Sequence, residues 1–373
     1  MTESKGFNPP PYPYDRLDEL KPLGAHHDGG IVDCSIGTPM DAPPSGVVAA
    51  LGNSNAERGY PPSIGTPEFR EAVATWTSQR LGCELDPAKE IAAAVGTKEF
   101  VVGLPHWMKL RRPDRDTVLY PAVSYPSYEM GAVLAGCRAV PVPVDTNWTI
   151  RLDAISAEDR SRALLLWVNT PGNPAGGLDD LDAAAAWGRS HHIPVFSDEC
   201  YCEFTWDGPP RTILSTGNQG VVAVHSLSKR SNLAGVRVGF YAGDPELVDY
   251  LREVRKHAGF MVPGPAQAAA VAALSDQEHV NHQRETYLDR LHRLANVMTA
   301  MGVETTIPRG GFYLWLPAPD GDAWAFTRQL VQQIGLLVSP GEFYGSAATN
   351  YVRIAAVQPD EKIEQLEQRV LKY

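Results

Sequence analysis

Short apolar runs recur through the middle of the chain and are separated by longer stretches of mixed polar and apolar positions. Seven runs have the length of β-strands and begin at Ile91, Thr117, Ala139, Ala163, Pro194, Val221 and Val238. They are rich in Val, Leu and Ile and do not alternate strictly, which is typical of parallel strands buried on both faces. The pattern therefore predicts a mainly parallel sheet of about seven strands.

Helix-like segments lie between these runs, for example LDDLDAAAAWGRSHH from Leu178. Buried strands that alternate with helices predict an α/β domain whose sheet is flanked by helices. After residue 265 the pattern changes to a long helical stretch around Asp276 to Met301, followed by the strand-like GGFYLWL and VRIAAV. We therefore expect a large domain over residues 45–265 and a smaller α+β domain over residues 266–373, which the N-terminal segment 1–44 joins.

The size and charge of the chain narrow the class of protein further. Its 373 residues exceed the size at which one hydrophobic core usually stops growing, and no long polar linker divides it, so two closely packed domains are expected. No apolar run approaches the roughly 20 residues of a membrane-spanning helix, and no targeting signal is visible, which favours a cytoplasmic protein. A net charge of −11 argues against binding to nucleic acid or anionic lipid. An anionic substrate must therefore meet local cations.

The segment HSLSKRSNLAGVRVGF carries the first candidate chemistry. It places Ser226, Ser228 and Lys229 where the chain leaves a predicted strand, and Arg237 follows soon after. A lysine amine can condense with an aldehyde, while two hydroxyls and a guanidinium can bind a phosphate dianion. Ligands of open α/β sheets bind at such strand ends. Alone, the motif is more typical of a solvated lysine in a serine-rich loop.

Two further predicted strands are followed by polar residues that suit the same chemistry. FSDECYCEF places Asp198 at the end of a strand with Tyr201 shortly after it, and a carboxylate there can pair with a protonated pyridine nitrogen. VNTPGNPAGG follows another strand and offers the amide of Asn173 to a phenolate oxygen. Taken singly, Asp198 is as typical of a helix cap and Asn173 of a turn. Together with Lys229 they indicate pyridoxal phosphate (PLP).

In order and spacing, Asn173, Asp198, Tyr201, Lys229 and Arg237 resemble the signature of the class I/II aminotransferases, PLP-dependent enzymes of fold type I. The resemblance spans nearly the whole chain. It implies that Lys229 carries PLP as an imine and later acts as the base. It also implies that Asp198 binds the ring nitrogen of the cofactor, and that Asn173 and Tyr201 bind its O3′ oxygen.

The same resemblance implies a phosphate site, a stacking residue and a carboxylate site. The phosphate-binding residues would be Gly96, Thr97 and Lys98 at the start of a helix, together with Ser226, Ser228 and Arg237. Tyr125 would stack on the pyridine ring of the cofactor. Arg353 would bind the α-carboxylate of the substrate in a bidentate pair, with the backbone of Gly37 as its helper.

Tyr60 resembles the tyrosine that reaches the cofactor phosphate of the neighbouring subunit. The resemblance therefore implies a homodimer with shared active sites. Its substrates would be amino acids and keto acids, and no metal ion is expected. We consequently predict an aminotransferase with PLP as its cofactor.

Several segments, among them SLSKRSNLAG, DECYCEF, VRKHAGFMVP and VSPGEFYG, resemble the actinobacterial branch of the succinyldiaminopimelate transaminases. The implied reaction exchanges an amino group between glutamate/2-oxoglutarate and N-succinyl-LL-2,6-diaminopimelate/N-succinyl-2-amino-6-oxopimelate in lysine biosynthesis. These substrates carry several carboxylates, so a second cation must bind the distal ones. The candidates are Lys98, Arg230, Arg58 and Arg309, among which the sequence does not choose.

Four different functions compete with this one. The first is that of another aminotransferase of the same family, for aspartate, an aromatic amino acid or N-acetylornithine. The second is that of a C–S lyase of fold type I, which shares the lysine, aspartate and tyrosine. The third is that of a cofactor-sensing transcription regulator, which needs a basic DNA-binding domain for which this chain leaves no room. The fourth is that of a zinc enzyme that uses His191, His192, Asp198 and Glu199, but adjacent histidines are poor joint ligands.

Overall fold

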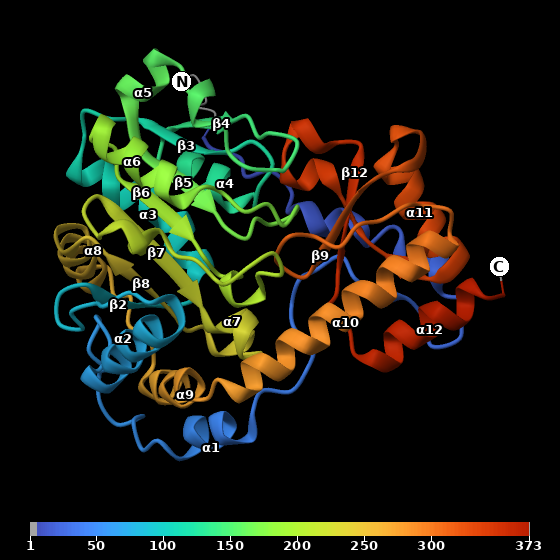
Figure 1. Cartoon of the computed structure of the whole chain (residues 1–373), viewed down its shortest axis with the longest axis horizontal. Coiled ribbons are helices and arrows are strands. Elements are labelled where there is room, and N and C mark those ends of the chain that lie inside the picture. The colour runs from blue at the N-terminus through green and yellow to red at the C-terminus, as the bar shows by residue number, and fades with distance from the viewer. Residues whose placement is uncertain (1–5, 373) are drawn as a thin grey trace.

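The computed structural model describes residues 6–372 and is built around a sheet of seven strands (Figure 1). The strand order is β2 (Ile91–Ala94), β8 (Gly239–Gly243), β7 (Val221–Ser226), β6 (Val195–Asp198), β5 (Ala163–Asn169), β3 (Thr117–Pro121) and β4 (Arg138–Val142). Each strand begins within one residue of its predicted start. β8 is antiparallel to both of its neighbours, and the other pairings are parallel. The predicted fold class is confirmed.

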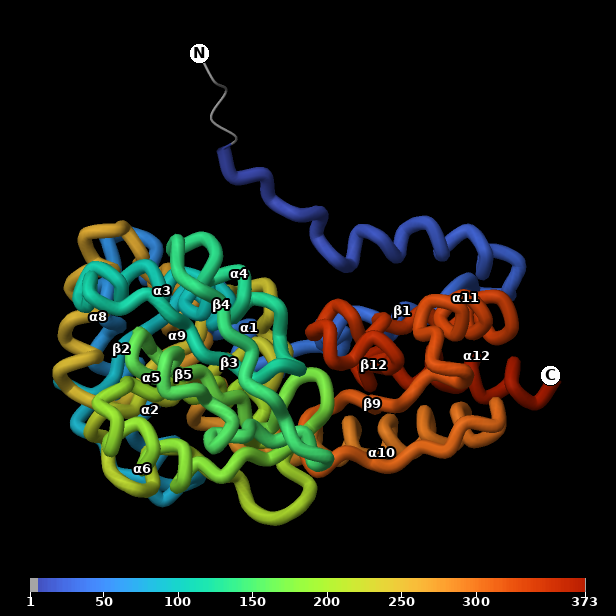
Figure 2. Tube along the Cα trace, turned by 90° about the horizontal axis from the view of Figure 1, so that it is seen from above, coloured from blue at the N-terminus to red at the C-terminus, as the bar shows by residue number. Residues whose placement is uncertain are grey.

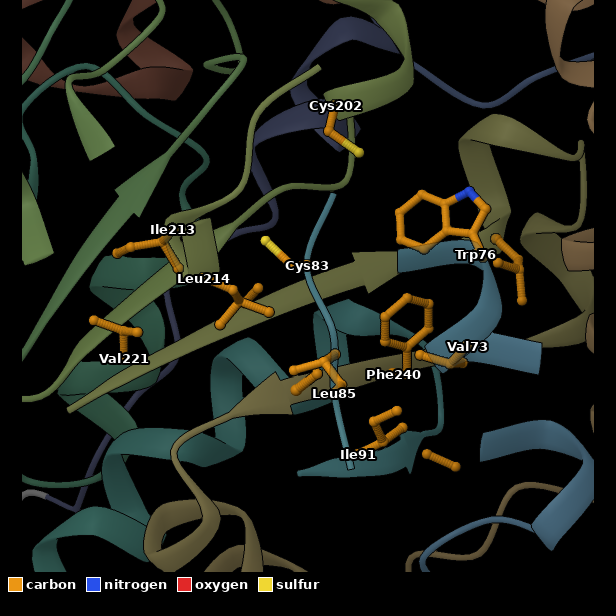
Figure 3. Packing of buried hydrophobic residues seen from close by; sticks show 14 of the residues in the cluster. Val73, Trp76, Cys83, Leu85, Ile91, Cys202, Ile213, Leu214, Val221 and Phe240 are labelled. Atoms are coloured by element: carbon orange, nitrogen blue, oxygen red, sulfur yellow. The ribbon is translucent and has the colours of Figure 1, made fainter. Parts of the chain in front are cut away.

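Both faces of this sheet are buried, because alternate residues of each strand enter different apolar clusters. On β7, Val221 and Ala223 pack in one cluster, while Val222 and Val224 pack in the other. Figure 3 shows the first cluster, in which Trp76 and Phe240 lie close together among aliphatic side chains and the thiol of Cys83. Burial on both sides explains why the strands read as continuous apolar runs.

The helices cover the two faces of the sheet and continue into the rest of the chain. Their bounds are α1 (Ser45–Asn53), α2 (Pro67–Leu81), α3 (Thr97–Arg111), α4 (Ser127–Leu134), α5 (Ala157–Arg162), α6 (Leu181–His191), α7 (Leu227–Arg230), α8 (Pro245–His257), α9 (Gly264–Ser275), α10 (Glu278–Ala300), α11 (Ala323–Ile334) and α12 (Asp360–Val370). The apolar residues of α2, α6 and α9 pack on one face of the sheet, and those of α3, α4 and α8 on the other. Within residues 6–372, no helix is long and apolar enough to cross a membrane.

A second, smaller lobe contains the remaining strands (Figure 1). The antiparallel strands β11 (Ser339–Pro340), β12 (Tyr351–Ala355) and β9 (Tyr313–Pro317) form one sheet, while β1 (Val32–Asp33) pairs in parallel with β10 (Leu336–Leu337). The long helix α10, which the sequence predicted, packs with these strands and with α12 in one apolar cluster. The pairing of β1 with β10 places residues 32 and 33 in this lobe.

The border between the lobes, expected at residue 265, remains a prediction, and the packing of α9 indicates a later position for it. α9 follows the predicted border at residue 265, yet Ala266, Ala269 and Leu274 are buried in the cluster of the large sheet. We therefore propose that the small lobe begins after Ser275. The helix α10 then leads directly from the large lobe to the small one (Figure 1).

Residues 6–24 cross the molecule before they join the small lobe. In Figure 2 this blue segment runs from above the large lobe to the outer end of the small lobe. Leu17 and Leu20 are buried against Phe343 and other apolar side chains of the small lobe, and Arg16 forms an ion pair with Glu342. The chain just ahead of these anchors therefore lies near the border between the lobes.

Candidate active site

The parallel strands β5, β6 and β7 end at the same edge of the large sheet, where Asn169 lies opposite Asp198. A cavity of about 510 Å³ opens there, between the large and small lobes. Twelve of the fourteen predicted site residues line it, namely Gly37, Thr97, Lys98, Tyr125, Asn173, Asp198, Tyr201, Ser226, Ser228, Lys229, Arg237 and Arg353. Strand ends of an open α/β sheet are where ligands bind, so the topology explains the convergence.

Lys229 lies on the single-turn helix α7, which begins directly after β7. The side chain of Ser226 caps this helix by accepting a hydrogen bond from the backbone N–H of Ser228 at 3.1 Å. The Lys229 amine donates a hydrogen bond to the backbone carbonyl of Gly37. Burial lowers the pKa of Lys229 to about 8, and the guanidinium groups of Arg353 and Arg237 act in the same direction. A usable fraction of the amine is therefore neutral near neutral pH.

Asp198 ends β6 and is held by two donors. The hydroxyl of Tyr128 donates to Oδ2 at 2.8 Å, and the backbone N–H of Cys200 donates to Oδ1 at 3.2 Å. Burial raises the pKa of Asp198, while these hydrogen bonds oppose that effect. Tyr128 is fully buried and was not among the predicted residues. The two donors fix the carboxylate at one wall of the cavity.

The start of α3 forms an anion-binding corner of the cavity. Gly96 precedes this helix with a φ of 70°, and no side chain caps the free N–H groups of its first turn. Ser226, Ser228 and Arg237 line the cavity as well. A Cβ at position 96 would meet the tip of the Arg237 guanidinium, and the φ of 70° is one that side chains rarely adopt, so the position favours glycine. Helix N–H groups, two hydroxyls and a guanidinium suit a phosphate dianion.

Arg353 forms a cationic wall on the small lobe. It lies on β12, is 2% exposed, and donates to Asn173 Oδ1 at 2.8 Å and to the Ser35 carbonyl at 2.6 Å. Its guanidinium stacks on Tyr313, with 4.1 Å between the guanidinium carbon and the ring centre. Within residues 6–372 no carboxylate pairs with it, and its Nε has no hydrogen-bond partner. A buried, unpaired guanidinium suits a carboxylate ligand.

Two predicted residues do not line the cavity. Gly96 lies behind Arg237, and Tyr60 is 94% exposed beside Arg58 in a separate surface hollow. Of the four candidate cations for distal carboxylates, only Lys98 lines the cavity. Arg230 is buried against Glu203, with 3.8 Å between Nε and the carboxylate, and Arg309 pairs with Asp207 at 2.9 Å. Arg230 and Arg309 are therefore directed to other partners.

Sequence reasoning also missed several residues of the cavity wall, among them Tyr12, Tyr14, Tyr128, Asn169, Cys200 and Tyr313. Asn169 and Cys200 carry a usable signal, because they lie at or just after strand ends. Tyr128 ends the SYPSY segment that contains Tyr125, but Tyr12, Tyr14 and Tyr313 come from segments without a recognisable motif, and only tertiary packing brings those three to the site.

The zinc hypothesis has no support in the geometry. His191 and His192 lie at the C-terminal end of α6. In the part of the chain that the structure describes, no three His, Cys, Asp or Glu side chains are grouped so that they could hold a metal ion. Asp198 is bound instead by Tyr128.

Fold and cavity together define a PLP-dependent enzyme, because the donor set fits each part of the cofactor: the anion corner its phosphate, Asp198 its ring nitrogen and Lys229 its aldehyde. Sequence comparison gives the family. The pattern described as "Aminotransferase class I and II" matches residues 30–370, so the chain belongs to the class I and II aminotransferases. The enzymes of this family depend on PLP and act on amino acids and keto acids.

The chain is similar over nearly its whole length to aminotransferases with different names. It is 40% identical to the 4-dedimethylamino-4-oxo-anhydrotetracycline transaminase OxyQ of Streptomyces rimosus, over 95% of this chain and 97% of that enzyme. Identity is 38% to a probable aminotransferase of Mycobacterium tuberculosis, over 95% of this chain and 83% of that protein. It is 31% to the LL-diaminopimelate aminotransferase of Dehalococcoides mccartyi, over 96% of this chain and 95% of that enzyme.

Solved structures give the same fold. Substrate-bound BacF from Bacillus subtilis superimposes with a TM-score of 0.89 at 26% identity, over 98% of both chains. A probable N-succinyldiaminopimelate aminotransferase from Thermus thermophilus superimposes with a TM-score of 0.85 at 30% identity, over 96% of this chain and 100% of that one. The predicted aminotransferase activity and PLP dependence are confirmed, while the succinylated substrate stays a prediction.

Proposed function

We propose that the chain transfers an amino group between glutamate and N-succinyl-2-amino-6-oxopimelate. The products are 2-oxoglutarate and N-succinyl-LL-2,6-diaminopimelate, a precursor of lysine. Each of these substrates carries a carboxylate in addition to the one beside its reacting carbon. The proposal therefore requires a second cation in the cavity, besides Arg353, for a distal carboxylate of the substrate, and the observation that carries it is the environment of Lys98.

Lys98 lies in the first turn of α3 on the large lobe, across the cavity from Arg353 on the small lobe. Its amine donates a hydrogen bond to the hydroxyl of Tyr12 at 3.2 Å and lies 4.8 Å from the centre of that ring. Burial works to lower the pKa of Lys98, but Tyr125 and Tyr12 outweigh it, so the pKa is raised. No acidic side chain among residues 6–372 pairs with this amine. A charged lysine without a carboxylate partner suits a distal carboxylate of the substrate.

PLP, when bound, supplies an electron sink for negative charge at the substrate α-carbon. Asp198 keeps a proton on the ring nitrogen, and Tyr128 fixes the Asp198 carboxylate for that task. Arg353 binds the α-carboxylate and thereby holds the α-carbon near Lys229. The Lys229 amine, whose pKa is lowered to about 8 in the absence of ligands, would be the group that takes the proton from the substrate α-carbon, and the bound cofactor would supply the electron sink for the charge left behind.

The names of two similar proteins support this substrate class. One is the LL-diaminopimelate aminotransferase of Dehalococcoides mccartyi, and the second is the probable N-succinyldiaminopimelate aminotransferase of Thermus thermophilus. OxyQ is named for a tetracycline derivative, which makes a larger ketone the main competing acceptor. Aminotransfer from aspartate, aromatic amino acids or N-acetylornithine, and C–S lyase activity, also compete with the proposed reaction.

The test follows each half-reaction by the absorbance of the bound cofactor. Purified enzyme is mixed with N-succinyl-LL-2,6-diaminopimelate alone, and the conversion of the pyridoxal to the pyridoxamine form is recorded. Addition of 2-oxoglutarate should then restore the original spectrum. Unsuccinylated LL-2,6-diaminopimelate, aspartate and cystathionine are measured in parallel, with pyruvate release as the sign of a lyase. An enzyme that responds to glutamate and ignores the succinylated compound would retain the family and contradict the substrate.

The role of Lys98 is tested with the variant Lys98→Gln, and Lys109→Gln is the matched control. Lys109 lies in the last turn of the same helix and does not line the cavity. We expect Lys98→Gln to raise KM for the succinylated substrate roughly 10-fold or more, as loss of a charge-assisted hydrogen bond of about 1.5–3 kcal/mol implies. KM for alanine, which has no distal carboxylate, should change little. Equal changes for both substrates would contradict the proposal.

We also propose that two copies of the chain share their active sites. Tyr60 is far more exposed than a tyrosine usually is and adjoins Arg58 in a surface hollow, where a second copy could cover both. Light scattering should give the mass of a dimer, and Tyr60→Phe should weaken PLP binding without changing that mass. A monomer, or a variant with unchanged PLP affinity, would contradict this arrangement.

A further inference from the structure

Tyr313 lines the cavity but has no part in the function proposed above. It begins β9 of the small lobe, and it is 2% exposed. Its hydroxyl lies 2.8 Å from the hydroxyl of Tyr201, which follows β6 of the large lobe. The guanidinium carbon of Arg353 lies 4.1 Å from the centre of its ring. Tyr313 therefore contacts both Tyr201, which is predicted to bind the O3′ oxygen of the cofactor, and Arg353, which is predicted to bind the substrate carboxylate.

The position of Tyr313 is tightly determined. Its ring packs edge-on against Tyr201, and the neighbouring Phe312 packs against both. A Cβ at Gly37 would collide with the Tyr313 hydroxyl, which shows how closely the substrate loop approaches this side chain. The hydroxyls of Tyr201 and Tyr313 consequently bridge the two lobes beside Gly37, whose carbonyl accepts the hydrogen bond from Lys229.

The direction of the hydrogen bond follows from counting protons. A tyrosine hydroxyl has one hydrogen to donate and can accept as well. If Tyr201 donates its hydrogen to the O3′ oxygen of the cofactor, the hydrogen between the two tyrosines has to come from Tyr313. The chain of donors then runs from Tyr313 to Tyr201 to O3′, and each bond strengthens the next.

We propose that Tyr313 is a positioning residue that couples the binding of a carboxylate at Arg353 to the strength of the hydrogen bond from Tyr201. This proposal deepens the proposed function. It rests on the role of Arg353 in binding the substrate α-carboxylate, and on the role of Tyr201 in binding O3′, which the family resemblance implies. The guanidinium over the ring favours donation by the Tyr313 hydroxyl, because positive charge near a hydroxyl makes it a better donor. A carboxylate that neutralises Arg353 weakens this donation, and Tyr201 then stabilises negative charge on O3′ less.

The measurable consequence concerns the pH at which the bound cofactor loses its proton. Donors to O3′ favour the deprotonated form and lower the midpoint of its absorbance change. A carboxylate at Arg353 should therefore raise this midpoint, in part directly and in part through Tyr313. Further ionisable side chains that face the tyrosine pair are Tyr14 of the N-terminal segment, Tyr125 ahead of α4 and Cys200 after β6.

The experiment titrates the absorbance of the PLP-loaded enzyme with pH, without and with saturating glutarate. Glutarate matches glutamate but lacks the amino group, so it cannot react. In the wild-type enzyme we expect glutarate to raise the midpoint. Tyr313→Phe should raise the midpoint of the free enzyme by about half a pH unit, as the loss of one neutral hydrogen bond implies, and should narrow the glutarate-induced difference.

Tyr344→Phe is the matched control. Tyr344 also stacks on Arg353, at 4.8 Å, but its hydroxyl meets that of Tyr14 at 2.9 Å and not that of Tyr201. This variant removes the same atom beside the same guanidinium and should leave the midpoint of the free enzyme near the wild-type value. Equal midpoints in Tyr313→Phe and Tyr344→Phe would overturn the proposal, and so would the absence of a glutarate effect in the wild-type enzyme.

Tyr201→Phe tests the coupling from the opposite end and does not depend on how well Tyr313→Phe folds. It should narrow the glutarate-induced difference by itself, and the double variant Tyr201→Phe/Tyr313→Phe should show no further narrowing. Independent effects of the two changes would contradict a shared path. The titration needs PLP and glutarate only, so its outcome is independent of whether succinyldiaminopimelate is the substrate.

Discussion

The hydrogen bond between Tyr128 and Asp198 allows the sharpest test of the site. Tyr128→Phe removes one buried oxygen and keeps the ring, which packs against Trp167 with 5.2 Å between ring centres. The lost bond goes to a carboxylate at 2.8 Å, and hydrogen bonds to charged groups contribute about 1.5–3 kcal/mol. The lower end applies, because the Cys200 N–H still binds the second carboxylate oxygen. A loss of about 1.5 kcal/mol corresponds to about one pH unit.

The sign of the effect follows from the direction of the Asp198 pKa. Burial raises the pKa of Asp198 in the folded protein. The contribution of protonated Asp198 to the stability of the fold is therefore present in acid and is lost as the pH rises through the pKa of the folded state. Tyr128→Phe raises the pKa further. In the proposed role, Asp198 has to be ionised to pair with the ring nitrogen of PLP. The affinity of the apoenzyme for PLP should therefore decline as the pH is lowered, and this decline should begin at a higher pH in the variant than in the wild-type enzyme.

The assay is a titration of the apoenzyme with PLP at a series of pH values. We expect the midpoint of the affinity profile to move up by about one pH unit in Tyr128→Phe. Tyr120→Phe is the matched control, because Tyr120 is buried in the same apolar cluster and does not line the cavity. If both variants give the wild-type midpoint, the hydrogen bond does not tune Asp198, and the reasoning is refuted.

Three more predictions address the remaining walls of the cavity. Because the pKa of Lys229 is lowered to about 8, the rate of PLP capture by the apoenzyme should rise with pH around that value. Below pH 8 the amine is charged in the folded wild type, which has then lost the stability that the neutral amine contributes. Lys229→Met should therefore make the apoenzyme more stable than the wild type below pH 8. A flat rate profile would contradict this. Arg353→Lys should raise KM for every amino acid substrate roughly 10- to 100-fold, since lysine cannot form the bidentate pair, and unchanged steady-state constants would exclude that role. Gly96→Ala should weaken PLP binding and cost about 1–2 kcal/mol of unfolding free energy, because the methyl group meets Arg237 at a positive φ; urea unfolding that matches the wild type would count against it.

The sequence predicted those parts of the structure that depend on local pattern. Seven apolar runs defined the sheet, because strands buried on both faces leave a continuous apolar record. Polar residues directly after β5, β6 and β7 converge, since parallel strands bring their ends to one edge. Asn173, Asp198 and Lys229 could therefore be placed together from the sequence alone.

The parts that could not be predicted depend on packing between distant segments. Tyr128 reaches Asp198 from the first turn of α4, and Tyr313 reaches Tyr201 from the small lobe, yet the sequence around neither tyrosine shows what its hydroxyl contacts. Arg230 was one of the four candidate cations for the distal carboxylates of the substrate. On a one-turn helix, however, consecutive side chains point in different directions, so Arg230 faces Glu203 in the interior. Arg230 is adjacent to Lys229 in sequence, but the four-residue helix α7 directs the two side chains to different sides.

The cavity is positively charged although the chain as a whole is negative, and the positive charge lowers the pKa of Lys229. The chain has a net charge of −11, whereas the cavity is lined by Lys98, Lys229, Arg237 and Arg353, with Asp198 as the only acidic lining residue among residues 6–372. The two arginines help to keep the pKa of Lys229 low. Any anion that neutralises one of them must raise it, by the same electrostatics. Without a ligand, the amine is thus more available as a nucleophile for an aldehyde. In the proposed mechanism, a phosphate at Arg237 and a carboxylate at Arg353 would raise the pKa of Lys229 and make it a stronger base at the stage when a proton has to leave the substrate.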